Sequence, residues 1–311
     1  MKKKLNIAIC NWNGVNTDLI EELKKRGHGV FMTLDQKDKK FLKKIDVLVT
    51  WNEVHQYGND IFLQEVNDMG IKTILVQHGR RGTSRIFPPF NEKLICKYAC
   101  VWSENDKKRL VSCGNPAERI IVTGTPIFRH LKPRIKHDGI NVLFSPEHWG
   151  EEIVENNIVA GALRKMSGVN IITKVLKGEH TPNQYDNVVI SDRNTLEHFP
   201  IVADVLSTAD VVVAISESTF ELLAESLDIP VVIADIWMPK ACQGDPRYKE
   251  IKHEFSNACV RVKDMNKFGE AIKYAVKHPE HLREERKKIT IDDGGQDIKN
   301  PVERIIEIIE A

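Results

Sequence analysis

The sequence has no long apolar run. None approaches the ~20 consecutive apolar residues that a membrane-spanning helix requires. The first apolar run, Leu5–Cys10, is no longer than a strand and lacks both the length and the small-residue cleavage site of a signal peptide. We therefore expect a cytoplasmic protein. Aromatic residues are also few, at 7%, but 41% hydrophobic and 29% charged residues are typical of a globular chain and exclude a disordered, collagen-like or fibrous one.

Cysteine is too sparse to form a recognisable metal centre. Cys96 and Cys100 are four positions apart, but no second pair of Cys or His follows at the spacing of a zinc site. Cys10 lies in a strand-like run, where a free thiol behaves as a small hydrophobe. Without a secretory signal, reduced structural thiols are expected. We predict neither a metal site nor a cofactor.

The net charge of +1 conceals an uneven distribution of charge. Residues 1–138 contain 25 Lys and Arg against 15 Asp and Glu, whereas the remainder contains 20 against 29. Two explanations stay open: a chance imbalance on a solvated surface, or a basic first half that faces an anionic acceptor or membrane surface. Binding to nucleic acid is a weaker alternative, because the sequence has no basic–aromatic interleaving and no recognition motif.

Strand-like and helix-like segments alternate along the chain, whose 311 residues suit two domains. Apolar runs rich in Val and Ile, alternating with helical periodicity, are typical of a parallel sheet covered on both faces. The pattern pauses at 124–138, where Pro126 and Pro133 interrupt it, and restarts at Ile140. The predicted strands are Leu5–Cys10, Val30–Thr33, Val47–Thr50, Thr73–Val76, Tyr98–Trp102, Ile120–Thr123, Ile140–Ser145, Val169–Lys174, Val188–Ile190, Val211–Ile215 and Pro230–Ala234.

This pattern predicts an α/β protein with two Rossmann-like parallel-sheet domains facing a cleft. We place an N-terminal domain at 1–128, a linker at 129–139 and a C-terminal domain at 140–298. A terminal helix at 299–311 is expected to pack back towards the first domain. Sheets of this kind bind ligands at the carboxyl ends of their strands, so functional residues are sought there.

His78 follows the strand Thr73–Val76 directly and is followed by Gly79. Because imidazole titrates near neutral pH, His78 is the best candidate for a general base. The residues after it, from Arg80 and Arg81 to a Ser/Thr pair, could bind an anion through their charge and backbone N–H groups. A structural hydrogen bond by a loop histidine is the alternative explanation.

Two further strand ends carry candidates. Gly124 and a proline follow the strand Ile120–Thr123, which is also the composition of a simple turn. Pro146 and His148 follow the strand Ile140–Ser145, and His148 could donate a hydrogen bond to a phosphate.

The strand Val211–Ile215 leads into the run Ser216–Thr219 and a predicted helix, Ser218–Leu227. Hydroxyl groups at a helix N-terminus form an anion site, because N–H groups and the positive end of the helix dipole are available there. Plain N-capping by Ser216 or Ser218 is the alternative. Glu217 and Glu225 are eight positions apart, which predicts similar helix faces and a carboxylate for a ribose at Glu225.

The order of these motifs resembles that of the CDP-glycerol glycerophosphotransferases, which have the GT-B fold of two Rossmann-like domains. The helix at Ser218 is also similar to that of UDP-N-acetylglucosamine 2-epimerases, and the Glu217–Glu225 spacing to that of retaining glycosyltransferases. The segments that carry the resemblance are Gln77-His78-Gly79, Gly124-Thr125-Pro126, Ser145–Trp149, Ser216–Thr219, and Asp293-Gly294 followed by Glu303-Arg304-Ile305.

The resemblance implies a transferase that moves a glycosyl or glycerophosphoryl group from a CDP-, CMP- or UDP-linked donor to a hydroxyl acceptor in surface-polymer or glycan synthesis. It implies that His78 deprotonates the acceptor and that His148 stabilises the leaving phosphate. The implied donor-binding residues are Gly79, Gly124, Pro146, Ser216, Glu217, Ser218, Thr219 and Glu225, and the implied acceptor-binding residues are Arg80 and Arg81.

The acceptor is expected to be anionic or lipid-linked, which would bring the protein to the inner face of the membrane. The donor's identity stays open, because Gln77 stands where the family has Trp, and Trp149-Gly150 where it has Arg. Ser216-Glu217 likewise replaces an Asp-Tyr pair. A UDP-amino-sugar 2-epimerase or hydrolase is the first alternative, and a DNA-modifying glycosyltransferase or nucleic-acid-binding module the second.

Overall fold

The computed structural model describes residues 3–10, 17–33, 39–50, 59–79, 93–146, 153–178, 185–192, 195, 197–215, 217–236 and 257–311. These residues form two compact units. Unit 1 comprises the described residues up to 79, from 93 to 127 and from 292 to 311, and unit 2 those from 128 to 291. Segment 292–298, which the sequence analysis placed in the C-terminal domain, is therefore part of unit 1.

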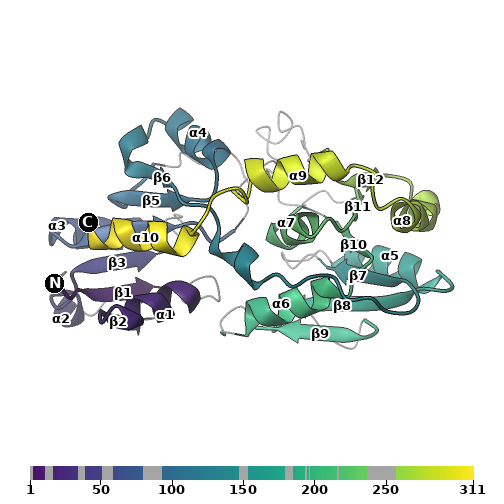
Figure 1. Cartoon of the computed structure of the whole chain (residues 1–311), viewed down its shortest axis with the longest axis horizontal. Helices are drawn as coiled ribbons and strands as arrows, with labels where there is room; N and C mark the ends of the chain where they lie inside the picture. The colour runs from purple at the N-terminus through teal and green to yellow at the C-terminus, as the bar shows by residue number, and fades with distance from the viewer. Residues whose placement is uncertain are drawn as a thin grey trace. The chain divides into compact units, whose positions relative to one another are not determined.

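Unit 1 is built on a parallel sheet in the order β2-β1-β3-β4-β5-β6 (Figure 1). Its strands are β1 (Asn6–Cys10), β2 (Gly29–Thr33), β3 (Val47–Thr50), β4 (Lys72–Val76), β5 (Tyr98–Val101) and β6 (Ile120–Val122). Its helices are α1 (Thr17–Lys25), α2 (Lys39–Leu42), α3 (Asn59–Asp68), α4 (Glu104–Ser112) and α10 (Pro301–Glu310), with the 3₁₀ turn η3 (Ala117–Arg119).

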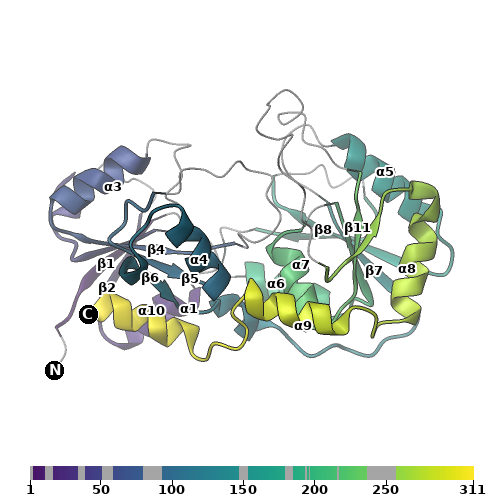
Figure 2. The ribbon, with the colours of Figure 1, turned by 90° about the horizontal axis from the view of Figure 1, so that it is seen from above.

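Side chains that alternate along the strands divide the core of unit 1 between the two faces of the sheet. Ala8 and Leu48 pack with Leu63 of α3 on one face. Ile7 and Val49, their neighbours in the chain, pack on the other face, which α1 and α10 cover (Figure 2). This is the period of two that a buried strand imposes. Helices on both faces thus leave the strand ends as the sites for function.

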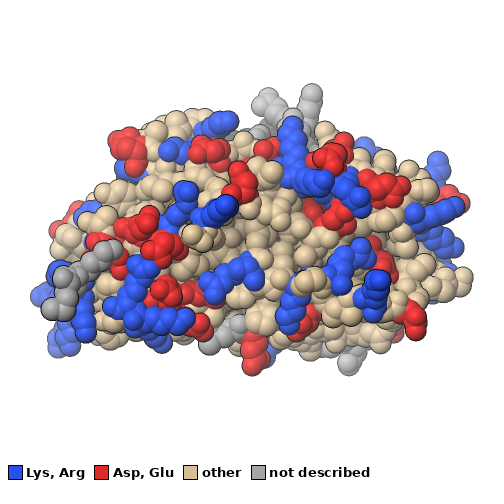
Figure 3. All heavy atoms as spheres, in the orientation of Figure 1, with Lys and Arg blue, Asp and Glu red and all other residues tan. Residues whose placement is uncertain are grey.

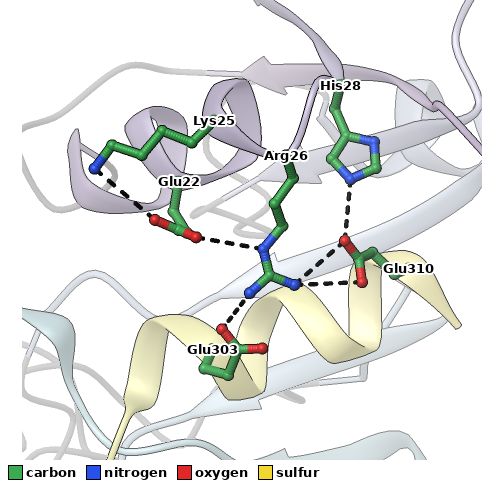
Figure 4. A network of polar contacts seen from close by, with 6 residues as sticks. All are labelled: Glu22, Lys25, Arg26, His28, Glu303 and Glu310. Atoms are coloured by element: carbon green, nitrogen blue, oxygen red, sulfur yellow. Dashed lines mark hydrogen bonds and ion pairs between the residues drawn. The ribbon is translucent and has the colours of Figure 1, made fainter. Parts of the chain in front are cut away.

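The C-terminal helix α10 is held against unit 1 by both apolar and charged contacts. Ile305, Ile306 and Ile309 are buried in the core beside α1. On the polar side, Arg26 forms ion pairs with Glu303 and Glu310 (Figure 4). A charged side chain with several partners at a half-buried position stabilises the docking more than an exposed pair does.

Unit 2 contains a second parallel sheet, in the order β12-β11-β10-β7-β8-β9. Its strands are β7 (Asn141–Ser145), β8 (Asn170–Leu176), β9 (Val188–Ser191), β10 (Val211–Ala214), β11 (Val231–Ala234) and β12 (Val260–Val262). Its helices are α5 (Ile153–Arg164), α6 (His198–Ser207), α7 (Thr219–Ser226), α8 (Phe268–Lys277) and α9 (Arg283–Asp292), and the 3₁₀ turns are η4 (Pro126–His130), which begins in unit 1, and η8 (Met265–Lys267). The predicted α/β class with two parallel sheets is confirmed.

Helix α9 is joined to the end of α7 by a buried arginine. The Arg286 side chain is 1% exposed, and its Nη2 and Nε atoms donate to Asp228 Oδ1 at 2.5 and 3.1 Å. Arg286 Nη1 also donates to the carbonyl oxygen of His281 at 2.6 Å. Asp228 has a positive φ of 57°, which is the left-handed conformation that ends many helices. A guanidinium group with several oxygen partners is one of the few charged groups that an interior accepts.

Candidate functional site

The strand order of unit 2 reverses between β7 and β10. These two strands are neighbours, with Ser145 in register with Ala214, and the chain leaves them in opposite lateral directions. At such a switch point the loops diverge and leave room for a ligand. Buried Pro146 follows β7, and Glu217 to Thr219 follow β10. The structure therefore places two of the predicted donor motifs at one point of the sheet edge.

Ser218 is the N-cap of α7. Its Oγ accepts from the N–H of Phe220 at 3.1 Å, and its own N–H donates to Glu221 Oε2 at 2.7 Å, which completes a capping box. The Ser218 hydroxyl also donates to Glu221 Oε2 at 2.5 Å. The capping role considered from the sequence is thus real. It fixes the direction in which the first N–H groups of α7 point, and leaves donor binding by Ser218 and Thr219 a prediction.

Both glutamates of the predicted pair are buried, but they do not share a helix face. Glu217 precedes the N-cap, so the expectation from their eight-residue spacing is wrong, whereas Glu225 lies in the last turn of α7. Each glutamate is 2% exposed. Cys259 donates from Sγ to Glu217 Oε1 at 3.2 Å. Carboxylates are costly to bury, so two of them in the segment that follows β10 mark this region as a candidate for more than packing.

Lys174 of β8 is a candidate that the sequence analysis missed. It is 8% exposed, and its Nζ atom lies 5.5 Å from the centroid of the Phe220 ring in the first turn of α7. This is the distance of a cation–π contact. The ammonium group therefore adds positive potential to the helix end where the sequence predicts phosphate binding. The only sign of Lys174 in the sequence is that it is the one charged residue of the otherwise uncharged strand Asn170–Leu176.

His78 lies in unit 1 just beyond the end of β4. Val76 is in register with Cys100 of β5, and the Gln77 N–H donates to the Cys100 carbonyl at 3.0 Å, so the ladder continues one residue past the strand. His78 and Gly79 are half-buried. The predicted general base is therefore at a strand end, accessible in part to solvent.

Gly124 packs against Gly295 of the segment that leads to α10. Both have positive φ, at 77° and 60°. A Cβ on Gly295 would lie 2.0 Å from the Trp102 carbonyl oxygen, and one on Gly124 would lie 3.0 Å from Ile298 Cβ. The two glycines let backbone segments approach closely. This packing explains why Gly124 is a glycine, and its predicted contact with a donor stays a prediction.

Four predicted residues, His148, Arg80, Arg81 and Ser216, lie outside the described residues. Among the described residues, no group of three or more His, Cys, Asp or Glu side chains could hold a metal ion. No helix in the described ranges is long and apolar enough to cross a membrane. Burial raises the pKa of the Cys100 thiol to about 12, so this cysteine is protonated and is no nucleophile at neutral pH.

No protein-family model matches the sequence, and no curated protein matches it. Solved structures are similar in fold. The UDP-GlcNAc 2-epimerase from Neisseria meningitidis, bound to UDP-GlcNAc, has a TM-score of 0.65 at 14% identity, over 99% of each chain. A variant of the wall teichoic acid polymerase TagF has a TM-score of 0.66 at 13% identity, over 99% of this chain and 89% of the other.

A glycosyltransferase from Rickettsia africae has a TM-score of 0.53 at 12% identity, over 98% of each chain. These similarities extend over both units and over nearly the whole of each compared chain. At identities this low, they show the fold rather than the activity. The chain has the GT-B fold of two Rossmann-like domains, as its motifs predicted.

Proposed function

We propose that this protein is a GT-B transferase that moves a glycosyl or glycerophosphoryl group from a CDP-, CMP- or UDP-linked donor to a hydroxyl group. The observation that carries the proposal is the start of α7 at the switch point of unit 2, where a capped helix N-terminus meets the buried ammonium group of Lys174. Helix N-terminal N–H groups and a cation together favour a phosphate. The fold similarity to TagF and to glycosyltransferases supports the same class.

In this proposal the two units have separate roles. The N–H groups at the start of α7 and Lys174 hold the donor's phosphates, while Glu225 accepts hydrogen bonds from the ribose. His78 removes the proton from the acceptor hydroxyl, whose oxygen then attacks the transferred group. The bond to the nucleotide phosphate breaks, and its electron pair leaves with the phosphate oxygen, which His148 stabilises. We propose an acceptor of surface-polymer or glycan synthesis.

A ligand screen tests the donor proposal. We expect CDP-glycerol or one of the CMP-, UDP- and GDP-sugars to raise the melting temperature, because a ligand that binds only the folded state stabilises it by mass action. No shift with any of these compounds would refute the proposal.

An epimerase is the second candidate, favoured by the similarity to an epimerase structure that holds UDP-GlcNAc. It differs from a transferase in needing no acceptor. Incubation with a UDP-amino sugar alone would then give an isomerised sugar or free UDP. A transferase gives neither at a comparable rate until a hydroxyl acceptor is added.

Replacing Lys174 with methionine is expected to weaken donor binding by ~10–100-fold, because a hydrogen bond to a charged group contributes ~1.5–3 kcal/mol. Methionine keeps the apolar contact with Phe220. Lys177→Met is the matched control, since the Lys177 side chain is 70% exposed and pairs with Asp192. Isothermal titration calorimetry with the stabilising donor checks the effect. Unchanged affinity in Lys174→Met, or an equal loss in the control, would exclude Lys174 from the site.

We also propose that unit 1 binds an anionic, lipid-bearing surface where its acceptor is found. Edge strand β2 exposes Phe31 and Met32, at 43% and 50%, and Phe31 contacts Phe41 of α2, with ring centroids 5.8 Å apart. Basic side chains gather over α2 in Figure 3. Apolar side chains flanked by cations are typical of proteins that bind membrane surfaces. The exposed lysines in and directly after α2 are Lys40, Lys43 and Lys44.

Neutralising these three lysines with glutamine is expected to weaken binding to phosphatidylglycerol-containing vesicles by about 100-fold, since each lysine near an anionic surface contributes ~1 kcal/mol. Co-sedimentation with the vesicles measures this. The control removes the same charge from unit 2 through Lys267, Lys273 and Lys277, which are exposed on or beside α8. Equal losses in the two variants would show a nonspecific charge effect and exclude the α2 surface.

A further inference from the structure

We propose that Gln77 is a positioning residue for His78, holding the backbone of residues 77–79 in one conformation through its side-chain amide. The inference rests on the proposed role of His78 as the general base. It concerns a position at which this chain departs from the family pattern, where a tryptophan precedes the histidine.

The Gln77 side chain is 0% exposed and fully used in hydrogen bonds. Its Nε2 donates to the Gly79 carbonyl oxygen at 3.0 Å and to Asp106 Oδ2 at 3.1 Å. Its Oε1 accepts from the Trp102 N–H at 3.0 Å, and its backbone carbonyl accepts from Trp102 Nε1 at the same distance. Both N–H groups of the amide and its oxygen therefore have partners.

These bonds hold the residues on either side of His78. The bond from Gln77 to the Gly79 carbonyl spans the histidine, so the backbone on either side of the imidazole is tied to one buried amide. The amide is tied in turn to the first turn of α4. There, Asp106 Oδ2 also accepts from the Ser103 hydroxyl at 3.2 Å, and the Asp106 N–H donates to that hydroxyl at 3.2 Å. The backbone of residues 77–79 is thus tied to the capped N-terminus of α4.

Only an amide of this length satisfies the three partners. A carboxylate at position 77 can still accept from the Trp102 N–H. Its second oxygen, however, would face the Gly79 carbonyl oxygen and Asp106 Oδ2, which are acceptors themselves, with no proton to share. A leucine of similar volume takes the amide partner from the Trp102 N–H, from the Gly79 carbonyl and from Asp106 Oδ2, and the loss of a buried hydrogen bond costs stability. Asparagine is one methylene shorter and cannot reach the same atoms from the end of β4.

The test compares Gln77→Glu with the double variant Gln77→Glu/Asp106→Asn. In the double variant, the amide introduced at position 106 can donate to the carboxylate at position 77, which restores one bond with donor and acceptor exchanged. No donor is restored to the Gly79 carbonyl. The melting temperature reports the structural bond. The rate at which diethyl pyrocarbonate modifies His78, followed by peptide mass spectrometry across pH, reports the position of the imidazole without any substrate.

We expect Gln77→Glu to lower the melting temperature and the double variant to regain most of the loss. We expect the pH profile of His78 modification to stay displaced in both. With the donor found in the screen, kcat should stay about 10-fold or more below the wild-type value in both, since small displacements of a reacting group are costly. The donor's KM should stay within about twofold, because the groups proposed to hold its phosphates and ribose belong to unit 2.

Recovery of the wild-type His78 profile together with stability in the double variant would overturn the proposal and leave Gln77 a structural residue. So would an unchanged profile in Gln77→Glu. If Gln77→Glu does not fold, the double variant alone supplies the decisive profile. The two proposals can fail separately. If the profile is displaced in both variants but the wild-type protein turns over no donor, the positioning of His78 is supported and the proposed function is refuted.

Discussion

Replacing His78 with alanine is expected to lower kcat by about 10²–10⁴-fold while donor affinity stays unchanged. The loss is that of a general base, which removes the hydroxyl proton in the transition state. Donor affinity should be preserved because His78 belongs to unit 1, at the end of β4, whereas the proposed phosphate-binding groups belong to unit 2. Single-turnover kinetics and calorimetry separate the two quantities.

The pH dependence of the reaction gives an independent check on His78. A base acts in its unprotonated form, so the wild-type kcat/KM should fall as pH decreases through the titration of the histidine. This acid limb should be missing in His78→Ala. His281→Ala, which changes an exposed histidine of unit 2, is the control. Turnover within about twofold of the wild type in His78→Ala would show that His78 is not the base.

Replacing Gly295 with alanine is expected to destabilise unit 1 by about 3 kcal/mol or more, because a clash and backbone strain coincide there. The new Cβ would lie 2.0 Å from the Trp102 carbonyl oxygen, at a φ of +60°. The backbone oxygen cannot move without disturbing the bonds of Trp102 with Gln77. The segment that leads to α10 must therefore separate from the sheet, and hydrogen exchange of 301–310 should increase along with the loss of stability.

Gly114→Ala is the matched control for Gly295→Ala. Gly114 has a φ of +85°, and nothing lies within 4 Å of the Cβ position. This variant measures the cost of the left-handed conformation alone, which is ~1–2 kcal/mol. Differential scanning calorimetry of both variants gives the difference due to the clash. Equal losses would show that Gly295 is required only for its conformation and that its close approach to Trp102 stabilises nothing.

Most strands could be predicted from the sequence because burial on both faces leaves a recognisable signal. Val47–Thr50 and Val211–Ala214, for example, are apolar or β-branched at every position, and all four residues of each are buried. Such runs have few alternatives in a chain with regular helical segments between them. The parallel arrangement followed from the same alternation, whereas the order of the strands within each sheet is known only from the structure.

Helix α9 was not predicted, and its stabilisation explains why. Its sequence is strongly charged and has no apolar stripe, so periodicity gives no signal. The residue that secures it is Arg286, which is buried through its bonds to Asp228, 58 positions earlier. Arg283 of the same helix also pairs with Asp228, and a helix that depends on ion pairs with a distant residue cannot be recognised from local pattern.

The candidate site was predicted in part for a similar reason. Predicting a strand also predicts where it ends, so the positions of His78, Pro146 and Glu217 just after the carboxyl ends of their strands were predicted correctly. Lys174 and Gln77 are candidates because of their contacts with Phe220 and Asp106 on other elements, and only the folded chain shows these contacts. Residues at strand ends are therefore easier to find in a sequence than residues that are recognised by contacts with distant elements.

In the proposed function, unit 2 holds a nucleotide-linked donor at the start of α7. Hydrogen–deuterium exchange with saturating CDP and with saturating UDP tests it directly, because bound phosphate slows the exchange of the N–H groups that it contacts. We predict that one of the two nucleotides protects peptides covering 217–226, and that Lys174→Met reduces this protection at the same nucleotide concentration. Protection confined to other segments, or none with either nucleotide, would contradict the account.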